Sequence, residues 1–335
     1  MQYYRYMPVV RTKAGEADAL GNLSPAAKAR VFPLIRLGGT VPTTFLPKMI
    51  ASAAGFPIAL DGVHNFTVAG SATAYNALFN ALGAGGVPVI PTLSLRAQPA
   101  YNAAAAALVG TYWPGFVLHV PLADLPHLAP WVASIPAWNP NQIDVLIDIS
   151  GVAEHAPIPY ANYVAQTLNA SLAANYPWRS VTLHSWSAPK DHGPLSPGRN
   201  DVPRLDWQTW QRARALVQFQ LDYSDSGHVH PSLDEVPGYA MANATVSVRY
   251  AIDERWIIQK GVRTSGANGI DMATQYRGHA QTLVADPAFG GLGVACWGDG
   301  RIQHYAVTPG GAGGRGQWAA LLLNRHISHV ADRLP

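Results

Sequence analysis

Apolar and polar residues alternate along the first eight positions of segment 217–225, VQFQLDYSD. Apolar side chains hold every second position: Val217, Phe219, Leu221 and Tyr223. The positions between them hold Gln218, Gln220 and Asp222. A period of two residues is typical of a β-strand that buries one face and keeps the other polar. We therefore interpret this segment as a strand whose polar face points into the interior of a barrel.

Seven earlier segments share this design, an apolar run that ends on a charged or hydrogen-bonding residue. The eight predicted strands cover residues 3–13, 31–37, 56–62, 87–96, 115–121, 143–150, 180–185 and 217–225. Helical stretches separate them at 15–30, 43–54, 71–82, 100–109, 125–138, 160–175 and 207–216, and Ser24-Pro25 is a good helix start within the first. Strands that alternate with helices predict a parallel sheet. Eight such units favour the α/β fold class, as a (β/α)8 TIM-like barrel over residues 1–227.

Residues 228–335 follow without a linker and have a different pattern. They predict a hairpin from segments 245–250 and 256–261, then helices at 272–285 and 318–334. Aromatic residues are frequent here, and such rings typically seal one layer against another. We expect a C-terminal α+β extension that packs on the barrel and belongs to the same cooperative unit. The Pro- and Gly-rich segment 187–201 is long enough to be a functional loop.

Composition narrows the function classes. The chain has 335 residues, of which 48% are hydrophobic and 13% charged, and its formal net charge is +3 without any basic run. This argues for a globular protein without a broad nucleic-acid-binding face. The single cysteine excludes an internal disulfide and a Cys-rich zinc site. No apolar run approaches the ~20 residues of a membrane span, so we expect a cytoplasmic protein that does not enter a membrane.

Short motifs along the whole chain resemble the beta-protein family, which is named from a T4-type phage protein. They are Tyr4-x-x-x-Pro8-Val9-Val10-Arg11-x-Lys13-x-Gly15-Glu16, Phe32-Pro33-Leu34-Ile35, Asp222-Tyr223-Ser224-Asp225, Val248-Arg249-Tyr250, Trp297-Gly298-Asp299 and Asn324-Arg325-His326-Ile327. The resemblance implies a link to phage–host conflict and brings no catalytic mechanism. The chain departs from the family pattern at Arg36, where an acidic residue is usual, and at Arg325, where a second histidine is common.

The strand alternation directs one polar set into the barrel near the carboxyl ends of the strands. This set comprises Arg11, Lys13, Arg36, Asp61, Arg96, His119, Asp148, His184 and Asp222, with Asp225 in the loop that follows. Barrel enzymes place their chemistry at this end. Four cations among these residues would suit an anionic small molecule such as a nucleotide or another phosphoester. The alternative is that arginine–aspartate pairs satisfy one another in the lumen without any ligand.

Two functions remain open. In the first, the protein is a phosphoester hydrolase in which Lys13 helps to hold the anion and Asp222 or His184 acts as general base. In the second, it is a non-catalytic sensor, inhibitor or protein-binding component of a phage–host conflict system. No HxH or HExxH spacing occurs, so the cofactor is unknown and a divalent metal on the aspartates and histidines has weak support. We expect Asp222, near Arg11 and Lys13 on the closing strand, to matter most, so that Asp222→Asn abolishes function.

Overall fold

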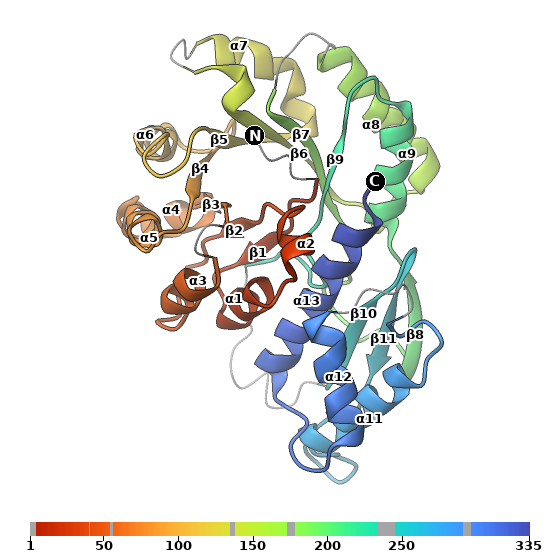
Figure 1. Ribbon diagram of the computed structural model, residues 1–335. Coiled ribbons are helices and arrows are strands. Elements are labelled where there is room, and N and C mark those ends of the chain that lie inside the picture. Colours follow the sequence, from red (N-terminus) through yellow and green to blue (C-terminus); the bar gives the residue numbers. More distant parts are fainter. Residues whose placement is uncertain are drawn as a thin grey trace.

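The computed structural model describes residues 5–39, 41–53, 56–134, 138–172, 178–233, 245–290 and 296–335. The predicted barrel is confirmed: eight parallel strands form one nearly closed sheet with helices around it (Figure 1). In sheet order the strands are β1 (Val9–Arg11), β2 (Leu34–Arg36), β3 (Ile58–Asp61), β4 (Val89–Ser94), β5 (Phe116–Pro121), β6 (Ile143–Gly151), β7 (Ser180–Trp186) and β9 (Asp222–Ser224).

The last strand closes onto the first through backbone contacts just before β1. Tyr6 forms parallel bridges with both Val31 and Tyr223. The Met7 N–H donates to the Tyr223 carbonyl at 2.9 Å, and the Val9 N–H donates to the Asp225 carbonyl at 2.7 Å. These bonds join β9 to the β1 side of the sheet and set the register in which their side chains face the lumen.

Helices follow the strands and cover the outside of the barrel (Figure 1). They are α1 (Ala14–Gly21), α2 (Pro25–Lys28), α3 (Phe45–Ala53), α4 (Val63–Ala69), α5 (Thr73–Ala84), α6 (Pro99–Ala106), η1 (Leu122–His127), α7 (Leu128–Ala133), η2 (Pro140–Gln142), α8 (Pro157–Ser171) and α9 (Leu205–Leu216). The predicted start at Ser24-Pro25 is confirmed, because the Ser24 hydroxyl caps α2 by accepting from the Ala27 N–H at 3.2 Å.

The barrel has separate inner and outer cores. The outer core packs the strands against the helices. The inner core fills the amino-terminal part of the lumen and consists of Met7, Val9, Phe32, Leu34, Ala59, Ile90, Val117 and Leu146. Because side chains alternate along a strand, the residues two positions later point into the same lumen, nearer the carboxyl end. Those positions carry the polar residues of the candidate site.

Two predicted strands are longer than the observed ones. The first prediction covers residues 3–13, whereas β1 spans Val9–Arg11 and Lys13 already stands at the N-cap position of α1. The eighth covers residues 217–225, whereas β9 begins at Asp222. Residues 217–221 lead from the end of α9 back to the barrel, so their alternation does not place Gln218 and Gln220 in the lumen. Residues 3 and 4 of the first predicted strand, and residues 54, 135–137 and 173–175 of the predicted helices, lie outside the described residues.

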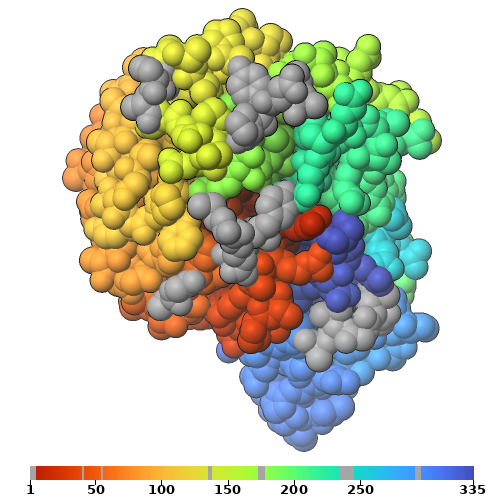
Figure 2. Space-filling model, turned by 45° about the horizontal axis from the view of Figure 1, so that its top comes forward, coloured from red at the N-terminus to blue at the C-terminus, as the bar shows by residue number. Residues whose placement is uncertain are grey.

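The extension contains a small antiparallel sheet of three strands. The predicted hairpin is present as β10 (Ser247–Ala251) and β11 (Arg255–Lys260). A third strand, β8 (Gly198–Pro203), pairs with β11 and comes from the segment after β7 that we had predicted as a loop. That prediction was wrong over 198–201, since polar strands without apolar alternation carry no periodic signal. Helices α11 (Met272–Val284), α12 (Trp297–Val307) and α13 (Arg315–Arg333) complete the extension, which forms a lobe beside the barrel (Figure 2).

Helix α13 joins the extension to the barrel. Leu323, Ile327 and Val330 belong to the outer core of the barrel, whereas Trp318 and Leu322 belong to the core of the extension. The helix packs along α1 and β10. None of the helices in the described ranges is both long and apolar enough to cross a membrane.

A chain that ends after residue 227 is expected to lose cooperative unfolding. Without α13, the part of the outer core that packs against Leu323, Ile327 and Val330 would face water, and Asp225 would lose its buried partner His326. Buried apolar area is the main favourable contribution to folding, so its exposure should leave a molten or insoluble fragment. Calorimetry of this fragment beside the full chain is the measurement. A fragment that melts cooperatively at the full-length temperature would mean that residues 1–227 fold alone.

Candidate functional site

Strand register places two rows of polar side chains at the mouth of the barrel. On one side, Arg11 pairs with Arg36 and Arg36 with Asp61. On the other side, Asp148 pairs with His184 and His184 with Ser224. Register partners in a parallel sheet point to the same face. Val9 and Leu34, two positions before Arg11 and Arg36, belong to the inner core, so this face is the lumen.

The two arginines are held by carboxylates on their own side of the barrel. Arg36 Nε lies 3.5 Å from Asp61 Oδ2, and Arg11 Nε donates to Glu16 Oε1 at 3.2 Å. The Arg11 backbone N–H also donates to the Glu16 carboxylate. Burial raises the pKa of Glu16, and the charge of Arg11 opposes that shift. In both pairs the carboxylate lies at Nε, the inner nitrogen of the guanidinium group.

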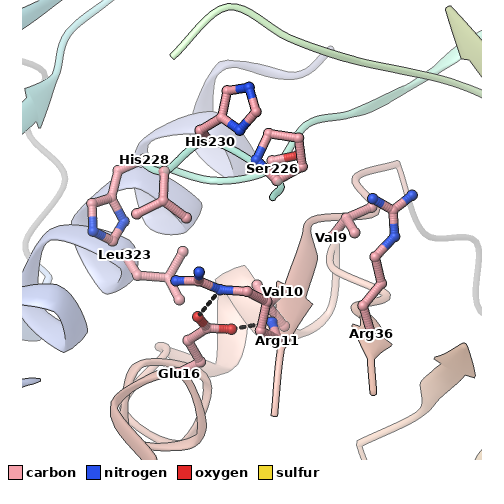
Figure 3. Close-up of a pocket in the computed structure, with 11 residues that line it drawn as sticks. Val9, Val10, Arg11, Glu16, Arg36, Ser226, His228, His230 and Leu323 are labelled. Carbon is pink, nitrogen blue, oxygen red and sulfur yellow. Dashed lines mark hydrogen bonds and ion pairs between the residues drawn. The ribbon is translucent and has the colours of Figure 1, made fainter. Parts of the chain in front are cut away.

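A small pocket lies beside these arginines. Its lining comprises Val9, Val10, Arg11, Glu16, Arg36, Ser226, His228, Val229, His230, Pro231 and Leu323 (Figure 3). Two buried polar atoms of this lining, Ser226 Oγ and His228 Nδ1, have no hydrogen-bond partner in the described part of the chain. An unsatisfied buried polar atom costs about 1–3 kcal/mol. Two such atoms beside two arginines indicate a site that receives water or a polar ligand.

An arginine of the extension holds the wall of this pocket in place. Arg249 on β10 donates to the His228 carbonyl at 2.8 Å and to the Pro189 carbonyl at 2.9 Å. Burial, followed by the charge of Arg11, lowers the pKa of Arg249 to about 10, so this side chain stays charged at neutral pH. Burial and the nearby charge of Arg249 lower the pKa of His228 well below its usual value. The pocket therefore combines positive charge with a neutral histidine.

A histidine–aspartate pair stands on β5 and β6. His119 Nε2 lies 2.9 Å from Asp148 Oδ2, and Asp148 Oδ1 accepts from the Ser150 N–H at 2.7 Å. Burial alone would raise the pKa of Asp148, but the His119 hydrogen bond and nearby charges, including Arg36, bring it well below its usual range. An ionised Asp148 accepts a hydrogen bond from the His119 Nε2–H, which leaves Nδ1 as the atom available for acid–base work. The pair has the geometry of a base oriented by a carboxylate.

Ser150 has an unusual backbone. Its φ is 63°, and among the described residues no other non-glycine residue has a positive φ. It lies where the pairing of β6 with β7 shifts register between Asp148 and Gly151. Such strain persists where the surroundings impose it, and it is concentrated at functional sites. Here it aims the Ser150 N–H at Asp148.

Substitutions at Ser150 should separate backbone strain from the side chain. Ser150→Gly removes the steric cost of the left-handed conformation, roughly 1–2 kcal/mol for a non-glycine residue. The glycine also makes the unfolded chain more flexible, which costs the folded state about 0.5–1 kcal/mol. We expect an unchanged or slightly higher free energy of unfolding. Ser150→Val should lower it, because a β-branched residue tolerates this conformation worst. Urea unfolding of both variants checks this; equal stability would mean that the strain is absent.

His184 is a buried neutral histidine beside this pair. The Ser224 hydroxyl donates to the Met7 carbonyl at 2.6 Å, so it can only accept at its 2.9 Å contact with His184 Nδ1. His184 therefore carries its proton on Nδ1, and Nε2 is an acceptor that has no partner among the described residues. Burial lowers the pKa of His184 to about 3, with the charge of Arg36 acting in the same direction. Its Nε2 is suited to accept a hydrogen bond and is a weak base.

Arg36 connects the two halves of the site. Its charge lowers the pKa values of both Asp148 and His184, although β2 lies across the barrel from β6 and β7 in strand order. The arginine side and the histidine side thus share one mouth.

The family model for beta protein matches residues 6–332. The chain belongs to the beta protein family.

Other comparisons add little for this beta family protein. No curated protein matches the chain. A solved structure, the biosynthetic arginine decarboxylase SpeA from Campylobacter jejuni, is similar at 11% identity and a TM-score of 0.42. The likeness covers 98% of this chain and 55% of the decarboxylase chain. This chain therefore spans about half the length of the decarboxylase. It is too distant to bear on fold or function.

Six residues predicted for the mouth of the beta family protein do meet there: Arg11, Arg36, Asp61, His119, Asp148 and His184. Arg96 does not. Strand β4 ends at Ser94, and Arg96 lies exposed beyond it, paired with Asp124 at 2.6 Å. Placing Arg96 in the lumen was therefore wrong, since the chain has already turned outward. Lys13 is half-buried at the start of α1, two residues after Arg11.

Asp222 and Asp225 lie elsewhere than we expected. Asp222 pairs with Thr182, which precedes His184 by two residues and so lies one layer deeper in the lumen. Its carboxylate accepts a hydrogen bond from Gln220 Nε2 at 3.0 Å. The seam register sets Asp222 level with Arg5, so its expected place beside Arg11 and Lys13 was wrong. Asp225 is fully buried outside the barrel wall, where Tyr6, Tyr223 and His326 bind its carboxylate. The effect of Asp222→Asn on function stays a prediction.

Sequence reasoning missed several residues of the mouth. Ser226 and His228 follow Ser224 at intervals of two residues, past the end of β9, and line the pocket beside Arg11. Asp222 was expected at that place. That two-residue spacing was a usable signal. Ser150 acts through its backbone geometry, and Glu16 acts through contacts of its carboxylate with Arg11; neither follows from the alternation along a strand. Within the described ranges, no group of three or more His, Cys, Asp or Glu side chains could hold a metal ion.

Proposed function

We propose that this beta family protein binds a phosphate-bearing ligand at the mouth of the barrel and hydrolyses a phosphoester bond there. The observation that carries the proposal is the meeting of Arg11 and Arg36 with the His119–Asp148 pair at one mouth. The two arginines supply fixed positive charge, and the pair supplies an oriented proton acceptor. Each half has a known use in phosphoryl chemistry.

The anion-binding half rests on the arginines and the pocket. Their Nε atoms contact Asp61 and Glu16, so the planar guanidinium groups are oriented before any ligand arrives. Planar guanidinium forks match two phosphate oxygens at once. Ser226 Oγ in the same pocket can donate a further hydrogen bond, because it has no partner among the described residues.

The chemical half rests on His119. His119 Nδ1 would take a proton from water as its oxygen attacks phosphorus and would then return that proton to the leaving oxygen. Asp148 holds the imidazole and stabilises the cation formed between the two transfers. The products are an alcohol and a phosphate, so no oxidant or other reactant is needed. Arg36 stabilises the charge that develops on the phosphoryl oxygens.

Binding of inorganic phosphate tests the first half. Arg36→Met should weaken it by roughly 10- to 100-fold, because a charged hydrogen bond contributes about 1.5–3 kcal/mol. Arg96→Met is a matched control, since the Arg96 side chain is 63% exposed, pairs with Asp124 and does not line the pocket. Isothermal titration calorimetry of the two variants and the parent chain is the measurement. Equal phosphate affinity in all three, or no binding by the parent chain, would reject the proposed site.

Binding without turnover is the second candidate. The charges of the mouth already pair as Arg36–Asp61, Arg11–Glu16 and His119–Asp148, and such pairs can hold a ligand without reacting. Membership of the beta protein family, which is named from a T4-type phage protein, supports a phage-related role, as hydrolase or as sensor. Release of nitrophenol from p-nitrophenyl phosphate by a protein that also binds phosphate separates the two.

A further inference from the structure

An aromatic side chain stands between the two halves of the mouth. Trp186 is the last residue of β7 and follows His184 by two positions, so it points to the same side of the sheet. The centroids of the two rings are 5.8 Å apart. On its other side, Trp186 meets the ring of His230 edge-to-face at 6.1 Å, and His230 lines the arginine pocket. The indole therefore links the histidine side of the mouth to the pocket.

The position of this indole is held by the backbone of β6. Trp186 pairs with Gly151 immediately after the register shift at Asp148. A Cβ added at Gly151 would lie 3.1 Å from Trp186 Nε1 and 3.4 Å from Cε2, so the glycine gives the ring its place. The indole is neither fully buried nor fully exposed. The indole is thus a ring held in a fixed position, partly exposed to solvent and next to the arginine pocket.

We infer that the indole of Trp186, flanked edge-to-face by His230, forms a platform on which an aromatic base stacks, so that the ligand of this site is a nucleoside phosphate. The inference rests on the proposed function, because the phosphate would lie on Arg11 and Arg36. Stacking on an aromatic side chain accepts any base, since every base has a π-face. The His184 ring lies beside the indole, and its buried Nε2 has no partner among the described residues, so the histidine side of the platform is neutral and polar.

Trp186 could instead have a purely structural role, either in the core or on the surface, and its burial and contacts argue against both. A tryptophan that only packed the core would be buried, as Trp256 and Trp318 are at 1% exposure each. A tryptophan that only covered the surface would have no reason to meet both a lumen histidine and a pocket histidine. Trp186 lies between these cases, at the place where a base joined to a bound phosphate would lie.

A comparison of four ligands tests the inference: inorganic phosphate, ribose 5-phosphate, adenosine 5′-monophosphate and cytidine 5′-monophosphate. The two nucleotides should bind the full-length protein roughly 5- to 150-fold more tightly than ribose 5-phosphate, the range that one stacked base provides. Trp186→Leu should remove this advantage and leave the affinity for inorganic phosphate within about twofold. Trp186→Phe should keep most of the advantage, because a phenyl ring still stacks.

Two further variants serve as controls. Gly151→Ala should also weaken nucleotide binding, because the new methyl group displaces the indole without touching the arginines. Trp113→Ala, at a 37% exposed tryptophan that precedes β5, should change neither affinity. Circular dichroism and melting temperature show whether each variant is folded.

The outcomes are distinguishable from those of the proposed function. Binding of phosphate that is lost in Arg36→Met, together with equal affinity for ribose 5-phosphate and the nucleotides, would overturn the platform and leave the anion site intact. No binding of any of the four ligands would overturn both. A 5′-phosphorylated trinucleotide that binds more tightly than the mononucleotides would identify a strand end as the source of the nucleoside phosphate, whereas weaker binding would identify the free nucleotide.

Discussion

Replacing Asp225 by alanine should lower the free energy of unfolding by about 3–5 kcal/mol, the cost of breaking a buried ion pair by removing one partner. Asp225 accepts hydrogen bonds from Tyr6 at 2.7 Å and Tyr223 at 2.9 Å, and His326 Nε2 lies 2.8 Å from its Oδ2. Arg204, which is also buried, lies 3.7 Å away. Removal of the Asp225 carboxylate would leave these tyrosine, histidine and arginine groups without their acceptor at the junction of the barrel and α13. Urea denaturation followed by tryptophan fluorescence measures the loss.

A surface pair provides the matched control. Asp18→Ala removes the partner of Lys48, whose side chain is 41% exposed, and should cost no more than about 1 kcal/mol. If Asp225→Ala costs no more than Asp18→Ala, the buried network does not join the extension to the barrel.

The contribution of Asp225 should also depend on pH. Burial would raise the pKa of Asp225, but His326 and Arg204 together lower it well below its usual value. A carboxyl whose pKa is depressed by folding stabilises the native state above its unfolded pKa of about 3.9. That stabilisation is lost as the pH falls from about 4 through the folded pKa. The stability difference between the parent chain and Asp225→Ala should therefore be constant near neutral pH and shrink below about pH 4.

Turnover of a phosphoester by the protein should fall about 10²- to 10⁴-fold in His119→Gln, the usual contribution of general acid–base catalysis. His119 is the histidine whose Nε2 contacts Asp148, and its side chain is 18% exposed, so its other nitrogen can reach solvent or a ligand. Asp148→Asn should also lower turnover strongly, because an amide can stabilise the wrong tautomer of His119. Phosphate affinity should change little in either variant.

His184→Gln separates this role from a merely local disturbance. His184 also lies in the lumen, but burial keeps its pKa at about 3, so it cannot serve as a general base matched to neutral pH. Steady-state hydrolysis of p-nitrophenyl phosphate by the three variants, with melting temperatures as a check on folding, is the measurement. Equal loss of turnover in His184→Gln and His119→Gln would contradict the assignment of the base to His119.

Hydrophobic periodicity predicted much of the barrel because it reports which face of each strand is buried. Segment 143–150 illustrates this: Ile143, Val145 and Ile147 face the helices, whereas Asp148 faces the lumen, as the alternation requires. The same rule placed Arg36, His119 and His184 correctly. It failed for Arg96 and for residues 217–221, because periodicity does not show where a strand ends.

The sequence by itself determined the order of the strands, their inner and outer faces and the full-length family resemblance, since each depends on local pattern or on motif order. Tertiary structure decided which polar residues meet. The seam register moved Asp222 away from Arg11 and brought His228 to the mouth, because register depends on hydrogen bonds between strands more than 200 residues apart. It also decided that Asp225 and His326 share one buried site, since only packing of α13 on the barrel brings them together.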